Sequence, residues 1–295
     1  MPTKAHTFAV VYLCRKVNPI WKSRAFLDSY FKFDPGPDYP LYFLQKGYAP
    51  GEVCDALKEL PASQRDRVRL LCITDDGMDK QAYAKACRQI TAFSHLLIMN
   101  SNAIILGQGW EKLYQTALDE TDGRDLIGAT GSWEAMTSLG VRFPNPHIRT
   151  SAFLVDRLRF LDSYGPVERL TKRDSYFMES GPDSLTRHYI AAGDRALVLD
   201  RHGRLHEVAD WATSHTYRAG NQENLLVGDL KTFRFFYLLK RNRLEISQRC
   251  WGDQKSATGG SWLTWLPYRI WYKHLYLGYR FRWLMRLTQR FRPVR

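Results

Sequence analysis

The sequence predicts an α/β protein whose mostly parallel sheet is flanked by helices, and three observations support this fold class. Short apolar runs alternate with segments of helical pattern over the first 105 residues, as in folds with right-handed β-α-β crossovers. Residues 96–99 are apolar throughout, which is typical of a strand buried on both faces. They end in Asn100-Ser101-Asn102, and open α/β sheets place ligands beyond the carboxyl ends of central strands. The alternative for this triplet is an ordinary turn, because Asn and Ser are common turn residues.

Each predicted element follows from a local pattern. Apolar runs bounded by polar or turn residues predict strands at 8–14, 41–44, 68–73, 96–99, 150–155 and 196–199. Amphipathic segments predict helices at 21–31, 51–60, 80–93 and 180–192, with another that begins at Trp110. Pro61 is expected to end the second of these helices, and Gly193 the helix that Ser180 opens. The polar segment 211–224 is expected to be a loop.

Charge divides the chain into two regions. The 295 residues carry a formal net charge of +13. Residues 231–295 contain 15 Lys and Arg but only two acids, Glu245 and Asp253, so residues 1–230 are neutral overall. We therefore expect a main ligand-binding domain at 1–230 and a basic, aromatic-rich helical extension at 231–295.

The extension has the composition of a membrane-surface helix. It contains 15 aromatic residues from Phe233 onward, five of them Trp. Arg269, Lys273 and Arg280 recur at helical spacing among apolar residues, as in helices that lie on anionic bilayers. The alternatives are a nucleic-acid-binding segment and a solvated helical appendage.

Cysteine usage and hydropathy indicate the compartment. The five cysteines are scattered and include no C-x-x-C pair, which argues against a disulfide framework and for a reducing environment. The N-terminus lacks the layout of a signal peptide, and no uncharged apolar run approaches the roughly 18–20 residues of a transmembrane helix. We expect a cytoplasmic protein that is peripheral at the inner face of the cell membrane.

The order of motifs resembles a known family. Asp75-Asp76-Gly77 follows an early strand, and the triplet 100–102 is followed by Gly109-Trp110 and a helix. In this arrangement residues 7–230 resemble the GT-A glycosyltransferases, most closely the family-2 enzymes that build bacterial surface polysaccharides. The resemblance implies a GT-A, Rossmann-like sheet. It also implies a hexosyltransferase-like, inverting enzyme that transfers a sugar from a nucleoside-diphosphate sugar to a glycan or lipid-linked glycan.

The resemblance also implies a donor site. Asp75 or Asp76 would contact the base or ribose of the donor, although either aspartate also suits a polar turn. Asn100-Ser101-Asn102 stands where the family has an Asp-x-Asp motif that holds a divalent metal against the sugar diphosphate. Here amides replace both carboxylates, and Mg²⁺ prefers anionic oxygen ligands. Asn102 and His215 are the remaining candidate ligands for Mg²⁺ or Mn²⁺, whose affinity should be low.

Cations must stabilise the leaving nucleoside diphosphate if metal is weak or absent. The candidates are basic residues in the second half of the main domain: His147, Arg149, Arg187, His215 and Arg218. Arginine suits this role because its planar guanidinium binds two phosphate oxygens at once. Each candidate is alternatively an ordinary surface charge.

An inverting transfer also needs a carboxylate that accepts the proton of the acceptor hydroxyl. By resemblance Glu179 is the first candidate for this base and Asp183 the second. Asp183 follows Ser180 by three residues and therefore also suits a helix-capping role. Trp211 is expected either to stack on a sugar face or to lie in the core.

Other classes of function are less consistent with the sequence. A non-catalytic scaffold or binding protein of the same fold is favoured by the amides at Asn100 and Asn102. A nucleic-acid binder would have to use the basic extension alone, because residues 1–230 are neutral. The chain has no Walker motif. It also lacks the glycine-rich signature that sugar-phosphate nucleotidyltransferases place after their first strand, near Cys14.

Overall fold

The computed structural model describes residues 7–165 and 171–257. Its main sheet has eight strands in the order β11-β10-β6-β9-β4-β1-β2-β3, in which β9 and β11 run antiparallel to their neighbours. The strands are β1 (Phe8–Arg15), β2 (Leu41–Lys46), β3 (Val68–Ile73), β4 (His95–Met99), β6 (Leu126–Gly128), β9 (Ala152–Asp156), β10 (Ala196–Leu199) and β11 (Leu205–His206). Two short pairs complete the β structure: β5 (Ile104–Ile105) with β12 (Val227–Gly228), and β7 (Gly131–Ser132) with β8 (His147–Ile148).

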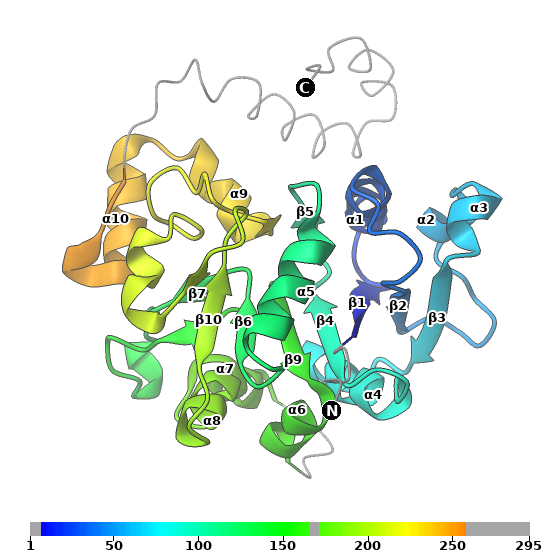
Figure 1. Ribbon diagram of the computed structural model, residues 1–295, viewed down its shortest axis with the longest axis horizontal. Coiled ribbons are helices and arrows are strands. Elements are labelled where there is room, and N and C mark those ends of the chain that lie inside the picture. Colours follow the sequence, from blue (N-terminus) through cyan, green and yellow to red (C-terminus); the bar gives the residue numbers. More distant parts are fainter. Residues whose placement is uncertain (1–6, 166–170, 258–295) are drawn as a thin grey trace.

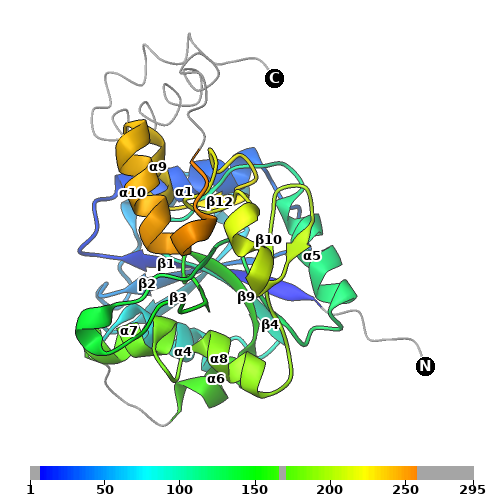
Figure 2. The same ribbon diagram turned by 90° about the vertical axis from the view of Figure 1, so that its left-hand side faces the viewer.

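Helices cover both faces of this sheet (Figures 1 and 2). They are α1 (Trp21–Lys32), α2 (Asp55–Lys58), α3 (Ala62–Arg65), α4 (Asp79–Gln89), α5 (Trp110–Glu120), α6 (Arg157–Tyr164), α7 (Lys172–Ser180), α8 (Leu185–Ala191), α9 (Leu230–Tyr237) and α10 (Lys240–Trp251). Three short 3₁₀ turns lie at Thr137–Leu139, Val208–Thr213 and Gly252–Gln254.

Strand β1 shows why the sheet is buried on both sides. Alternate residues of a strand point to opposite faces. On one face Val10 and Tyr12 pack with the aromatic and aliphatic side chains of α1 and α5. On the other face Val11 and Leu13 pack with α4, α6 and α8. The predicted α/β fold class, with its mostly parallel sheet between helices, is therefore confirmed.

The structure differs from the sequence-based prediction at several helices. The helix expected at 51–60 is only α2, and a second short helix, α3, follows Pro61. The helix expected at 180–192 begins at Leu185, because the Ser184 side chain accepts a hydrogen bond from the backbone N–H of Arg187 and caps α8 there. The capping role considered for Asp183 is therefore wrong. Helices α6 and α7 were not predicted.

The first part of the basic extension packs onto the sheet domain. Asp229 caps α9 by accepting hydrogen bonds from the backbone N–H groups of Lys231 and Thr232, both at 2.9 Å. Trp251 at the end of α10 is buried, and its Nε1 donates to the Tyr217 carbonyl at 3.0 Å. The expected membrane-surface segment with Arg269, Lys273 and Arg280 lies outside the described residues. Within residues 7–165 and 171–257, no helix has the length and apolar character needed to cross a bilayer.

Candidate functional site

Polar residues gather at one edge of the sheet. Strands β1, β2, β3 and β4 are parallel, so their carboxyl ends lie together at this edge. Strand β9 starts from the same edge, because Ala152 pairs with Met99 at the end of β4. The Asn100 N–H donates to the Ser151 carbonyl at 3.0 Å. The edge therefore joins residues 100–102 to residues 149–151.

Four charged residues form one part of this edge, which we call the outer cluster: Arg15, Lys46, Asp75 and Asp79. Lys46 Nζ lies 3.1 Å from Asp75 Oδ1, and an Arg15 nitrogen lies 3.9 Å from the same oxygen. The other terminal nitrogen of Arg15 lies 3.6 Å from Asp79. Lys46 is only 1% exposed, whereas Asp75, Asp79 and Arg15 are partly open to solvent. Asp75 is thus held at the carboxyl ends of β1 and β2.

Its neighbour Asp76 points elsewhere. Asp76 Oδ1 lies 2.6 Å from Lys85 Nζ on α4 and accepts a hydrogen bond from Thr74 Oγ1, also at 2.6 Å. These two hydrogen bonds lower the pKa of Asp76 to about 2. The two aspartates proposed to contact the donor base or ribose therefore point to different places. Asp75 is held by Arg15 and Lys46 at the ends of β1 and β2, whereas Asp76 is held by Lys85.

The triplet after β4 forms a turn and also presents a free amide oxygen. Asn100 Oδ1 accepts from the backbone N–H of Asn102 at 2.9 Å, and the Ala103 N–H donates to the Asn100 carbonyl at 3.0 Å. The Ser101 carbonyl accepts from the Tyr12 hydroxyl at 3.2 Å, so the turn is fixed to β1. Asn102 Oδ1 is buried and has no hydrogen-bond partner among the described residues.

A second group of charges, which we call the inner cluster, comprises Arg149, Asp229, Glu179 and Lys80. Arg149 is 4% exposed and lies between β8 and β9. Its Nη2 donates to Asp229 Oδ2 at 2.9 Å, and its guanidinium stacks 4.1 Å from the centre of the Tyr217 ring. Its Nη1 is buried without a hydrogen-bond partner in the described part of the chain. Burial alone would raise the pKa of Asp229, but Arg149 holds it below its usual value.

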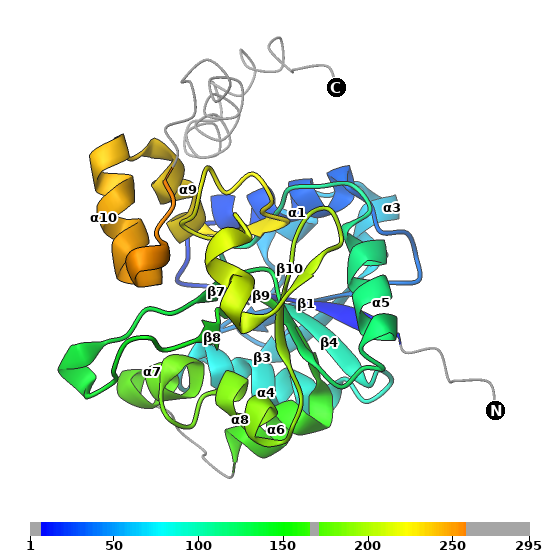
Figure 3. The same cartoon turned by 60° about the vertical axis from the view of Figure 1, so that its left-hand side comes forward.

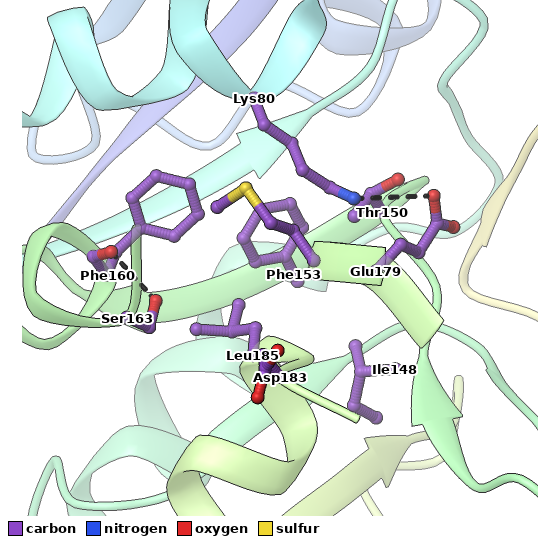
Figure 4. Close-up of a pocket in the computed structure, with 10 residues that line it drawn as sticks. Lys80, Ile148, Thr150, Phe153, Phe160, Ser163, Glu179, Asp183 and Leu185 are labelled. Carbon is purple, nitrogen blue, oxygen red and sulfur yellow. Dashed lines mark hydrogen bonds and ion pairs between the residues drawn. The ribbon is translucent and has the colours of Figure 1, made fainter. Parts of the chain in front are cut away.

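Glu179 lies near the end of α7, where Lys80 of α4 approaches it (Figure 4). Lys80 Nζ is 3.8 Å from Glu179 Oε2 and also donates to the Ser175 carbonyl. Burial lowers the pKa of Lys80 to about 8, although Glu179 opposes this shift. Burial also acts to raise the pKa of Glu179, but Lys80, His147 and Arg149 outweigh it and keep the carboxylate ionised.

Glu179 and Asp183, the two candidate bases, line the same pocket. Its other lining residues are mainly apolar side chains and include Phe153, Met178 and Leu185 (Figure 4). Asp183 lies in the short connection between α7 and α8 and is exposed. Glu179 is the candidate that contacts a cation of the inner cluster.

The other predicted cations do not gather at one point. Arg218 pairs with Glu134, and His215 Nδ1 lies 2.6 Å from Glu223 Oε1. Arg187 is exposed and lies 3.4 Å from the Asn145 side-chain oxygen. His147 is buried, which lowers its pKa and favours the neutral ring. Arg149 and Arg218 each have a buried N–H group without a hydrogen-bond partner among the described residues, and of these two permanent cations Arg149 is the one that is itself buried.

The predicted ligands and the Asp229 carboxylate near them do not fit a divalent metal. Asn100 Oδ1 is already a hydrogen-bond acceptor, and Asn102 Oδ1 is an uncharged ligand. The nearby carboxylate of Asp229 is bound by Arg149 and by the start of α9. His215, the second candidate ligand, faces Glu223. The described residues contain no group of three or more His, Cys, Asp or Glu side chains that could hold a metal.

Several residues of the site were not singled out from the sequence. Arg15 and Lys46 are the last residues of β1 and β2, so a search for charges at predicted strand ends would have found them. Asp229 begins the pattern of a helix cap, completed by Thr232. No local sequence pattern marks Lys80 as a site residue, because its role depends on the packing of α7 on α4, which brings Glu179 to it. Trp211 proves to be core: it is fully buried, and its Nε1 donates to the His206 carbonyl at 3.0 Å.

Solved structures to which the chain is similar include distant likenesses among sugar-transferring proteins. No protein-family model matches the chain, and no curated protein matches it. Among solved structures, the galactosyltransferase LgtC in complex with donor and acceptor sugar analogues aligns with a TM-score of 0.41 and 11% identity, covering 59% of this chain and 71% of LgtC. HddC from Yersinia pseudotuberculosis aligns with a TM-score of 0.38 and 14% identity, covering 56% of this chain and 83% of HddC. TarS of S. aureus aligns with a TM-score of 0.37 and 13% identity, covering 53% of this chain and 29% of TarS. Likenesses of this size identify no function, so the function must be argued from the site.

Proposed function

We propose that the chain is an inverting glycosyltransferase of the GT-A type. It would transfer a sugar from a nucleoside-diphosphate sugar to a glycan or lipid-linked glycan acceptor. The observation that carries this proposal is a set of unsatisfied polar groups at the sheet edge, which comprises Arg15 Nε and Asp79 Oδ1 of the outer cluster and one group on each of Arg149 and Asn102. Arg149 Nη1 is a charged donor and Asn102 Oδ1 is a neutral acceptor, and both are buried without a partner among the described residues. Buried polar groups are costly to leave unpaired, so a ligand with acceptor oxygens and hydroxyl groups is expected there.

The two unsatisfied groups belong to one neighbourhood. Gly228 of β12 pairs with Ile104 of β5 in an antiparallel ladder. Asp229 follows Gly228 and Ala103 precedes Ile104, so Asp229 and Ala103 lie at the same end of this ladder. Asp229 in turn binds Arg149. Lys231 adds a further positive charge, and the proximity of Arg149 lowers its pKa. This concentration of positive charge suits a diphosphate, whose oxygens the free side of the guanidinium can bind.

Each group has a role in the proposed transfer. Asp75 would bind the nucleoside, Arg149 the diphosphate, and Asn102 a hydroxyl of the donor. The acceptor oxygen attacks the anomeric carbon, and the bond from that carbon to the diphosphate breaks. Its electron pair leaves with the nucleoside diphosphate, where Arg149 stabilises the added charge. Glu179, which is ionised, takes the proton of the acceptor hydroxyl. The donor set at this edge provides no metal-dependent step.

Calorimetric titration of UDP, GDP and TDP into the purified chain tests the donor site, with and without Mg²⁺ or Mn²⁺. We expect one nucleotide to bind with little dependence on metal. Arg149→Lys keeps the charge but loses the planar fork, and should weaken that binding about tenfold or more. Arg187→Lys makes the same change at an exposed arginine and should have no effect. Asp75→Ala should weaken binding more than Asp76→Ala, because Lys85 directs Asp76 away from the outer cluster.

The amides at Asn100 and Asn102 favour one other function, a non-catalytic protein that binds nucleotide sugars. Activity assays separate the enzyme from the non-catalytic protein. The chain is incubated with sugars linked to the nucleotide that binds, either in water alone or with glycan acceptors. An enzyme releases nucleoside diphosphate, and Glu179→Gln should reduce that release without reducing nucleotide affinity. Binding without any release would establish the non-catalytic protein. No nucleotide binding under any condition would contradict both.

A further inference from the structure

The connection between α9 and α10 exposes apolar surface among positive charges. Leu239, the residue before α10, is 77% exposed, the highest value among the large hydrophobic side chains of the described residues. Leu238, the residue after α9, is half-buried beside it. Arg234, Lys240 and Arg241 flank the pair and are exposed. We call these five residues the α9–α10 corner.

The corner is rigidly built. Arg243 is buried under it, and its guanidinium donates to the carbonyls of Phe235 at 3.0 Å and Phe236 at 2.7 Å, at the end of α9. The same guanidinium donates to Asn221 at 2.9 Å. Both helices lie at the periphery of the molecule, with α10 outermost (Figure 3). These hydrogen bonds fix the turn between α9 and α10 to the domain, and the turn holds Leu239 in solvent.

The charge of the corner itself is of one sign. Residues 234–241 contain three Lys and Arg and no Asp or Glu, and the next acid along α10, Glu245, is paired with Arg249. The sequence beyond the described residues continues this composition, because residues 258–295 contain eight Lys and Arg, ten aromatic residues and no acid. An exposed leucine that basic residues precede and follow in the chain suits a surface that is anionic outside and apolar beneath. A duplex nucleic acid offers anionic charge but no apolar layer for Leu239.

We propose that the α9–α10 corner docks onto the surface of an anionic lipid bilayer. Leu239 enters the boundary between headgroups and acyl chains, while Arg234, Lys240 and Arg241 contact anionic headgroups. Each well-placed basic residue near such a surface adds to the attraction, so Arg234, Lys240 and Arg241 act together. This docking does not depend on the proposed sugar transfer.

Co-sedimentation of the full chain with lipid vesicles tests the proposal. Vesicles of phosphatidylcholine with phosphatidylserine are compared with vesicles of phosphatidylcholine alone. Wild type should bind the anionic vesicles, and Leu239→Glu should bind them about tenfold or more weakly. The matched control is Leu158→Glu, the same change at a leucine of α6 that is 61% exposed. Arg241→Glu should also weaken binding, whereas Arg65→Glu on α3 should not.

Some outcomes would overturn the proposal. Equal vesicle binding by Leu239→Glu and Leu158→Glu would show that the corner does not touch the bilayer. Equal binding of wild type to both kinds of vesicle, or to neither, would show that anionic lipid is not the partner. Circular dichroism and thermal melting of each variant distinguish a lost contact from a lost fold. Nucleotide titration of Leu239→Glu should match wild type, so a failed donor site and a failed docking surface are told apart.

Discussion

The outer and inner clusters place similar charges at the same sheet edge but in different surroundings. In the outer cluster Asp75, Asp79 and Arg15 are partly open to water, and only Lys46 is fully buried. In the inner cluster Arg149, Asp229 and Lys80 are all buried, and Glu179 is partly open to water. Exposed ion pairs contribute little to stability, whereas removing one partner of a buried pair leaves an uncompensated charge. We therefore expect the outer cluster to contribute less to stability than the inner cluster, which should serve both stability and binding.

The largest effect is expected at Asp229. Asp229→Ala leaves the Arg149 guanidinium buried without its partner and removes the cap of α9, which should cost about 3–5 kcal/mol of unfolding free energy. Asp75→Ala in the outer cluster should cost less, because the Asp75 side chain is 41% exposed and Lys46 Nζ keeps its hydrogen bond to the Gly77 carbonyl. Urea unfolding of the two variants measures the difference. Adding Arg149→Met to Asp229→Ala should restore part of the stability, because the unpaired charge is then gone. Equal losses in Asp229→Ala and Asp75→Ala would contradict the comparison.

An intermediate effect is expected from Lys80 at alkaline pH. The folded chain releases the Lys80 proton near pH 8 because burial lowers its pKa to about 8, and the unfolded chain releases it near pH 10.4. Between these values the unfolded state binds more protons, so this residue makes stability rise with pH. Relative to Lys80→Met, the wild type should gain up to about 3 kcal/mol across this window. Urea unfolding of both proteins at several pH values measures the gain, and parallel curves would refute it.

The smallest effect is expected at the exposed pair of Asp76 and Lys85. The pKa of Asp76 is lowered to about 2 in the folded chain, and its unfolded value is near 3.9. Its contribution is therefore present above about pH 4 and is lost as the pH falls through about 2. Because both side chains are partly exposed, solvent screening should limit the loss in Lys85→Met to less than about 1 kcal/mol at neutral pH. Acid unfolding curves of the variant and wild type check this, and a loss as large as that of Asp229→Ala would be inconsistent with it.

Most of the secondary structure near the site could be predicted, because its signals are local. The strands at 68–73 and 196–199 match β3 and β10 residue for residue, since each is a short, mainly apolar segment bounded by polar residues. Helix α7 was missed, although a capping box at Thr171 and Asp174 marks its start. Glu179 was selected from a resemblance, yet its place at the end of a helix beside Lys80 depends on how α7 packs against α4. No local pattern carries that information.

The sequence by itself determined the alternation of strands and helices, the amides after the central strand and the basic composition of residues 231–295. The tertiary structure decided which charges meet. Strand β9 lies antiparallel between β4 and β6. Its apolar sequence pattern does not indicate in which direction the strand runs. That reversal brings Arg149 to the edge where β4 ends, and it meets Asp229 across 80 positions of sequence. Periodicity is a local property, whereas the partner of a buried charge is fixed by the packing of the whole chain.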